Sequence, residues 1–159
     1  MSRLDSFIRR MQAQRLLIDY ASDAIKDIAG PVLELGLGKG RTYHHLRERL
    51  PERRVIVLDL KVTELLDSSP PPQDLLLGDI KETARGLVGI GAALLHSDIG
   101  PGDPKRGEAT AHWLPGLVPM LLAQGGLALS DEPLENPQLV PLPLPGGIPE
   151  RRYFLYRRE

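Results

Sequence analysis

The 159-residue chain contains no cysteine, which excludes disulfide bridges, thiolate zinc sites and a cysteine nucleophile. It also lacks an excess of charge of either sign, because 20 Lys and Arg residues stand against 21 Asp and Glu residues. A nearly neutral chain has no overall field with which to hold a polyanion. We therefore expect no nucleic-acid partner.

Long apolar runs are missing as well, and none approaches the roughly 18 residues that span a bilayer. The first residues, Met1 to Asp5, lack the apolar segment of a secretory signal. We expect a cytoplasmic protein without a membrane partner. The length suits a single domain with a full sheet-and-helix core.

Short apolar runs alternate with stretches of helical periodicity along most of the chain. Apolar strands separated by helices are typical of a parallel sheet that is buried on both faces. The sequence thus predicts a doubly wound, mostly parallel, Rossmann-like α/β fold. The expected strands cover residues 32–35, 54–58, 74–77, 92–95 and 127–129, and the expected helices cover residues 6–29, 42–50, 81–87 and 108–123.

The two ends of the chain depart from this alternation. Residues 1–30 carry one long amphipathic helix, which we expect to pack on the core or on a partner subunit, so that a homodimer or higher homo-oligomer is expected. Residues 31–159 would form the catalytic or binding domain. The proline-rich stretch after Asp131 permits only an edge strand or hairpin arm, and the run at 153–156 predicts an antiparallel last strand.

Acidic residues end four of the expected strands, and glycines end the first. In open α/β sheets, ligands bind outside the carboxyl ends of the strands. We expect the site at this edge, near Asp59, Asp79, Asp98 and Asp131.

The glycine turn at residues 34–42 departs from two common nucleotide-binding patterns. A Walker A loop requires Lys-Ser/Thr directly after its last glycine, but Arg41-Thr42 follows Gly40. A dinucleotide fingerprint requires a glycine where Arg41 stands. Both nucleoside-triphosphate and NAD binding are therefore disfavoured.

The pattern present is acid-x-Gly-x-Gly-x-Gly, starting at Glu34, with Asp59 ending the next strand. From about Pro31 to the C-terminus, the chain resembles the class I S-adenosylmethionine-dependent methyltransferases, and residues 32–48 resemble their small stand-alone bacterial members. The resemblance implies that Asp59 binds the ribose, Asp79 contacts the adenine amino group, and Glu34 orients the turn or contacts the methionine amino group. Asp79 could instead cap the following helix. The implied cofactor-binding set is Glu34, Gly36, Leu37, Gly38, Gly40, Thr42, Asp59, Leu60, Gly78, Asp79, Ile80, Ser97 and Asp98.

The acceptor side carries weaker signals. The run Ser97–Gly100 stands where amino-methylating relatives have Asn/Asp-Pro-Pro-Tyr/Phe, so that chemistry is not supported. His96 and Asp98 are the candidate catalytic residues, since a histidine of ordinary pKa can act as a general base. His96 could equally be a hydrogen-bonded wall residue. Asp98, Asp131 and Glu132 resemble a magnesium set only in part, and we expect no metal.

We therefore expect a methyltransferase that uses S-adenosyl-L-methionine and acts on a small molecule, because the lean chain leaves little room for a polymer-docking domain. A non-catalytic module that binds S-adenosylmethionine or S-adenosylhomocysteine is the main alternative. An NAD-type oxidoreductase is a further one.

Overall fold

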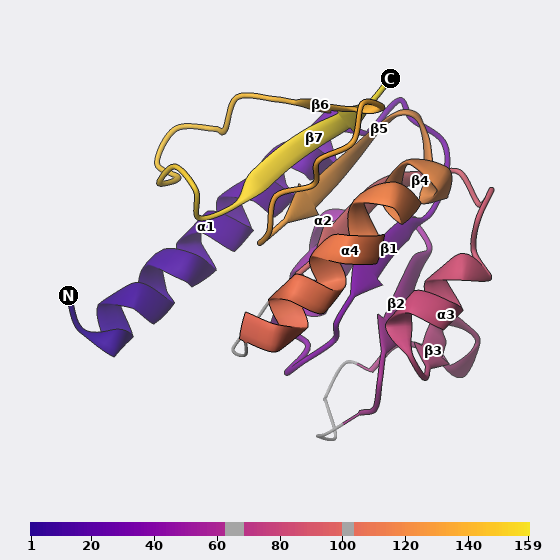
Figure 1. Cartoon of the computed structure of the whole chain (residues 1–159), viewed down its shortest axis with the longest axis horizontal. Helices are drawn as coiled ribbons and strands as arrows, with labels where there is room; N and C mark the ends of the chain where they lie inside the picture. Colours follow the sequence, from indigo (N-terminus) through magenta and orange to yellow (C-terminus); the bar gives the residue numbers. More distant parts are fainter. Residues whose placement is uncertain (63–68, 100–103) are drawn as a thin grey trace.

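In the computed structural model, the described residues are 1–62, 69–99 and 104–159, with only the backbone described for 104–108. They form a seven-stranded sheet of order β3-β2-β1-β4-β5-β7-β6 (Figure 1). The first five strands are parallel, and β7 runs antiparallel to both β5 and β6. The strands are β1 (Val32–Leu35), β2 (Val55–Asp59), β3 (Leu75–Leu77), β4 (Ala92–Ser97), β5 (Leu122–Ser130), β6 (Leu139–Pro141) and β7 (Phe154–Arg158). The mostly parallel Rossmann-like sheet and its antiparallel last strand are confirmed.

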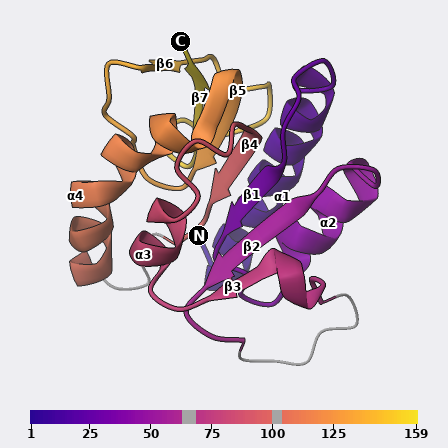
Figure 2. The same cartoon turned by 90° about the vertical axis from the view of Figure 1, so that its right-hand side faces the viewer.

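Helices cover both faces of this sheet, as Figure 2 shows. One layer holds α1 (Arg3–Ala24) and α2 (Arg41–Arg49), and the other holds α3 (Ile80–Arg85) and α4 (Pro104–Leu121). A 3-10 turn, η1 (Pro72–Asp74), precedes β3. Every residue of β1 and β4 is buried, which explains why these strands read as continuous apolar runs rather than alternating ones.

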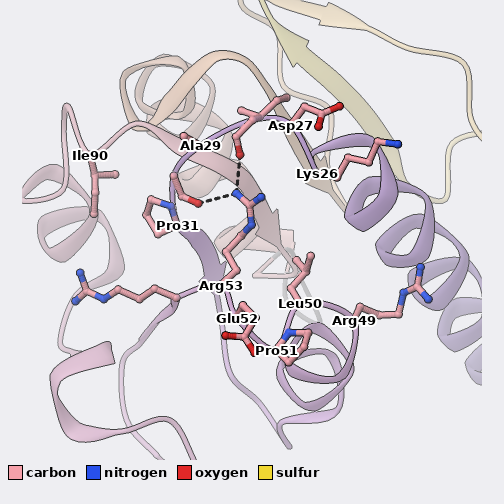
Figure 3. Close-up of a pocket in the computed structure, with 13 residues that line it drawn as sticks. Lys26, Asp27, Ala29, Pro31, Arg49, Leu50, Pro51, Glu52, Arg53 and Ile90 are labelled. Carbon is pink, nitrogen blue, oxygen red and sulfur yellow. Dashed lines mark hydrogen bonds between the residues drawn. The ribbon is translucent and has the colours of Figure 1, made fainter.

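The first helix begins and ends earlier than its apolar periodicity predicts. It begins at Arg3 because Ser2 and Asp5 form a reciprocal capping box, in which Oγ of Ser2 accepts from the Asp5 amide at 3.0 Å. It ends at Ala24, and the guanidinium of Arg53 then donates to the carbonyls of Ile28 and Gly30 at 2.7 and 2.8 Å. Figure 3 shows Arg53 in this position, in a cavity of about 770 Å³ at the amino-terminal edge of the sheet.

Burial changes along α1. Its central residues Ala13, Leu17, Ile18 and Ala21 are closed off from solvent against the sheet and α2. In its first turns Leu4, Phe7 and Ile8 are exposed, and Figure 1 shows these turns reaching beyond the sheet. Among the described residues, no helix combines the length and apolar character that crossing a membrane requires.

Strand β5 is longer than the apolar run at 127–129 indicates. It follows α4 directly and begins at Leu122, with a register shift opposite Ala92 and Leu94. Gly125 has a φ of +79°, and a Cβ at Gly126 would lie 2.8 Å from the Ala92 carbonyl oxygen. This glycine pair interrupts the apolar pattern, so the sequence pattern does not predict the first half of the strand.

Candidate active site

A cavity of about 830 Å³ lies at the carboxyl ends of the parallel strands. Its volume is within the range of ordinary small-molecule sites. The glycine turn after β1 and the residues that follow β2 and β4 form its base, and α1, α3 and α4 supply its walls. In the described part of the chain, this cavity thus lies at the edge where the sequence predicts the site.

The glycine turn owes its shape to backbone conformations that other residues rarely adopt. Gly36, Gly38 and Gly40 all have positive φ, at +90°, +52° and +74°. A Cβ at Gly36 would lie 2.8 Å from Cγ2 of Ile99, whereas a Cβ at Gly38 would meet nothing within 4 Å. Gly38 therefore has open space beside it on the cavity side of the turn.

Asp59, at the end of β2, holds this turn in place. Its Oδ2 accepts from the amides of Leu37 at 2.8 Å and Gly38 at 3.3 Å, and its Oδ1 accepts from the amide of Leu60 at 2.7 Å. The carboxylate is half-buried and lines the cavity. It therefore positions the glycine backbone, a role that the sequence did not reveal.

Asp79 combines the two roles weighed for it. Its side chain caps α3 by accepting from the Glu82 amide at 3.2 Å, and the same residue lines the cavity with Ile80 and Leu60. Gly78 is not a wall residue, but its amide donates to the Asp59 carbonyl at 3.0 Å and so joins β3 to β2 at this edge.

Glu34 and His96 lie beneath the cavity, not on its wall. Oε1 of Glu34 accepts from Oγ1 of Thr42 at 2.9 Å and lies 2.9 Å from Nδ1 of His96. Glu34 is 0 % and His96 1 % exposed. Burial lowers the pKa of His96, but the charge and hydrogen bond of Glu34 outweigh it and raise the pKa above its ordinary value.

Three buried polar atoms near this pair have no hydrogen-bond partner among the described residues: Oε2 of Glu34, Nε2 of His96 and Oγ of Ser97. Such atoms are costly in a protein interior. Thr42 does line the cavity, so the pair is linked to the cavity wall through one hydrogen bond. His96 itself is closed off from solvent and is not among the described residues that line the cavity.

Asp98 lies on the cavity wall and is held by residues that sequence reasoning missed. Nη2 of Arg10 lies 2.6 Å from both Asp98 oxygens, and Nε2 of Gln14 donates to Oδ2 at 2.7 Å. Nε of Arg10 also donates to the hydroxyl of Tyr153 at 3.3 Å. Burial, together with Asp98, raises the pKa of Tyr153 to about 12.

Asp131 directly follows β5, and its carboxyl group is close enough to Asp98 of the cavity wall to feel its charge. Its burial and the neighbouring carboxylates of Asp98 and Glu132 raise its pKa to about 7. Within the part of the chain that the structure describes, no three acidic or histidine side chains are grouped closely enough to hold a metal ion. Gly100, which completes the run singled out after β4, lies outside the described residues.

Part of the cavity wall is apolar and aromatic. Trp113 of α4 and Phe7 and Met11 of α1 form this part. The guanidinium carbon of Arg41 lies 5.5 Å from the centre of the Phe7 ring, within cation–π range.

A family model described as S-adenosyl-L-methionine methyltransferase matches residues 1–158. The chain belongs to this methyltransferase family. A crystal structure of an S-adenosyl-L-methionine methyltransferase from Silicibacter pomeroyi DSS-3 is 40 % identical, with a TM-score of 0.92. That match covers 100 % of this chain and 99 % of the other. A search of the curated proteins gave no match.

Two more distant structures share the methyltransferase fold. A TDP-rhamnose 3′-O-methyltransferase of calicheamicin biosynthesis is 21 % identical over 98 % of this chain and 83 % of its own, with a TM-score of 0.61. Human methyltransferase-like protein 13, in complex with S-adenosylhomocysteine, is 13 % identical over 93 % and 81 %, with a TM-score of 0.63. This methyltransferase therefore uses S-adenosyl-L-methionine, as the sequence predicts.

The residues around the cavity fit this cofactor. The open space at Gly38 lets a ligand approach the backbone of the turn. Asp59 places a carboxyl group on the wall, and its two oxygens can accept from a pair of ribose hydroxyls. A nicotinamide cofactor, the alternative drawn from the sequence, is not the one that this family uses.

Proposed function

We propose that the enzyme methylates a small molecule bound in the 830 Å³ cavity, beside the glycine turn and Asp59. The observation that carries this proposal is that one cavity contains both halves of such a site. The turn and Asp59 form one side, and Phe7, Met11 and Trp113 form the other. The second side would hold the acceptor.

The acceptor half is lined by helices of the same chain. Both α1 and α4 contribute residues to the lining of the cavity. A cavity of this volume suits a compact ligand better than a duplex or a folded protein, which would need an extended surface. This arrangement supports a small-molecule acceptor, which we also expect because the chain leaves little room for a polymer-docking domain.

In this proposal Gly36, Gly38 and Gly40 shape the loop against which the methionine part lies, and Asp59 binds the ribose. Leu60, Asp79 and Ile80 form the wall of the adenine part. Glu34 acts from beneath the turn through Thr42. The bound cofactor supplies an electrophilic methyl group, and the chain brings the acceptor into line with it while excluding water. The remaining members of the expected binding set, which we retain in this proposal, are Leu37, Gly78, Ser97 and Asp98.

The catalytic candidates have unequal positions. Asp98 lines the cavity, but its carboxylate is already shared by Arg10 and Gln14. His96 is enclosed and paired with Glu34. We therefore propose Asp98 as the residue nearer the acceptor, and His96 as a residue that positions Glu34. The expected homo-oligomer and cytoplasmic location stay predictions.

Calorimetric titration tests the cofactor half. The purified chain is titrated with S-adenosylmethionine, S-adenosylhomocysteine and, as a control, NADH. We expect the first two to bind in the micromolar range and NADH not to bind. Absence of binding by both sulfur compounds would refute the proposed site.

A methyl-transfer screen tests the acceptor half. Radiolabelled S-adenosylmethionine is incubated with the enzyme and either small hydroxyl, amine and carboxylate compounds, or RNA and total protein. Label in the small-molecule fraction supports the proposal. Label found only in RNA or protein would overturn it.

A further inference from the structure

The first helix places a charged and apolar face on the acceptor half of the cavity. Phe7, Arg10 and Met11 line it from α1 at helical spacing, and Phe7 is 44 % exposed. Large apolar side chains exposed at a cavity wall are commonly covered by a ligand. Since these residues and the glycine turn share one cavity, the acceptor is the ligand that would cover them.

Arg10 is fixed so that one of its nitrogens stays available. Nη2 binds both oxygens of Asp98, and Nε donates to the hydroxyl of Tyr153. Nη1 has no hydrogen-bond partner among the described residues, and the side chain is 44 % exposed. An anchored guanidinium loses little further conformational entropy when its remaining nitrogen binds an oxyanion, and the hydrogen bond that forms is charge-assisted.

Arg41 provides a second guanidinium, beside Phe7. It is the first residue of α2, it lines the same cavity, and its guanidinium carbon lies over the Phe7 ring. No carboxylate of the described residues lies within ion-pair distance of it. Among the described residues, Arg10 is thus paired with Asp98, whereas Arg41 has no acidic partner.

The described wall carries more positive than negative side chains. Apart from Lys39, the described lining residues include four cationic side chains and three carboxylates. Each carboxylate already accepts hydrogen bonds from the protein: Asp59 from the glycine turn, Asp79 from α3 and Asp98 from α1. An anionic ligand would therefore meet few competing negative groups.

We infer that the acceptor is a small carboxylic acid with a flat apolar body, whose carboxylate binds Arg10 and Arg41 while the body packs on Phe7, Met11 and Trp113. The inference rests on the proposed function, because it assumes that the acceptor occupies this half of the cavity. It adds the charge and shape of the acceptor, which that function leaves open.

Paired ligands provide the test. The enzyme is first saturated with S-adenosylhomocysteine and then titrated with 1-naphthoate or indole-3-acetate, and with the matching neutral amides. We expect each carboxylate to bind at least about tenfold more tightly than its amide, because two arginines favour the charged form. The Arg10→Gln and Arg41→Gln variants should each reduce that ratio to below about threefold, because each removes one of the two positive charges that favour the acid over the amide.

Arg9→Gln is the matched control, since Arg9 is exposed on the same helix and does not line the cavity. It should keep the wild-type ratio. Arg10→Lys retains the charge without the fork, and thermal unfolding of each variant shows whether it is folded. Arg41→Gln, on an exposed side chain, tests the inference even if the Arg10 variants are unstable.

Two results would overturn the inference. One is equal affinity for acid and amide in the wild-type complex. The other is that Arg10→Gln and Arg41→Gln weaken the binding of S-adenosylhomocysteine but not that of 5′-methylthioadenosine, which lacks the amino-acid end. The arginines would then bind the carboxylate of the cofactor instead of that of the acceptor. Failure of S-adenosylhomocysteine to bind the wild type is a separate result, which refutes the proposed function itself.

Discussion

Nδ1 of His96 lies 2.9 Å from Oε1 of Glu34, and the two residues are direct neighbours on the parallel strands β1 and β4. Both side chains are enclosed in the layer between the sheet and α1 and α2. Thr42 joins them through Glu34, so the pair connects the interior of the sheet to the start of α2 just after the glycine turn. A buried charge is tolerated only when it is paired, and Glu34 is the neighbour that raises the pKa of His96 against the effect of burial.

His96→Ala should therefore destabilise the fold strongly, because it leaves the Glu34 carboxylate buried without its partner. We expect the free energy of unfolding in urea to fall by about 3 kcal/mol. The control is His44→Ala, since the His44 side chain is exposed and its contact with Glu48 is long, at 3.8 Å. It should change the stability by less than about 0.5 kcal/mol. Similar losses in the two variants would show that the buried pair has no special weight.

Asp131 predicts a pH dependence of stability. Its folded-state pKa is raised from 3.8 to about 7. An acid whose pKa is higher in the folded state contributes stability below its unfolded pKa, and that contribution is lost as the pH rises through the folded value. Between about pH 4 and pH 7, the wild type should lose this contribution.

The Asp131→Asn variant should lack this loss and should be more stable than the wild type at pH 8, by about 1 kcal/mol. Urea unfolding at several pH values measures it. Glu150→Gln, at an exposed position, should follow the wild-type curve. His96, whose pKa is also raised, adds a further loss as the pH rises above about 6.5 in every variant that retains it. An unchanged slope in Asp131→Asn would contradict the prediction.

Asp59→Asn tests the carboxylate that holds the glycine turn. Asparagine keeps one oxygen, so it can still accept from one side, but it loses the charge and the second acceptor. We expect S-adenosylhomocysteine to bind more weakly by about 1.5 to 3 kcal/mol, the scale of hydrogen bonds to charged groups. Calorimetry measures this, and Asp23→Asn, at an exposed position outside the cavity, serves as the control. An unchanged affinity in a folded Asp59→Asn variant would remove this residue from the site.

Much of this arrangement could be predicted from the sequence, because it depends on local patterns. Apolar runs revealed the strands, and the glycine spacing with Asp59 revealed the edge where the site lies. The setting of Asp98 could not be predicted. Its partners Arg10 and Gln14 are 88 and 84 residues away in the chain, and the Arg10–Tyr153 bond joins residues 143 apart. Nothing in the pattern around Arg10 distinguishes it from Arg9, since only the docking of α1 turns one inward and the other outward.

Gly38 allows backbone strain to be separated from ligand contact. Gly38→Ala should cost about 1 kcal/mol of stability, because alanine is strained at a φ of +52°. The matched control is Gly89→Ala, since Gly89 also has positive φ and open space around it but does not line the cavity. Both variants should unfold at similarly lower urea concentrations, and only Gly38→Ala should lose affinity for S-adenosylhomocysteine. Equal affinities would mean that the open space at Gly38 is not used by the cofactor.

Arg53 gives a prediction away from the active site. Its guanidinium donates to the carbonyls of Ile28 and Gly30, and also to that of Ile25 at 3.2 Å, so it joins the chain after α1 to the start of β2 (Figure 3). Arg53→Ala leaves these partly buried carbonyls without a charged donor, and we expect a loss of about 2 kcal/mol in the free energy of unfolding. Arg85→Ala is the control, because Arg85 is exposed and pairs at 3.1 Å with Glu82, whose side chain is also exposed. It should cost less than about 1 kcal/mol.

Arg53 lies at the opposite edge of the sheet from the glycine turn. The affinity for S-adenosylhomocysteine should therefore be unchanged in folded Arg53→Ala. A selective loss of binding would show that the two edges are coupled.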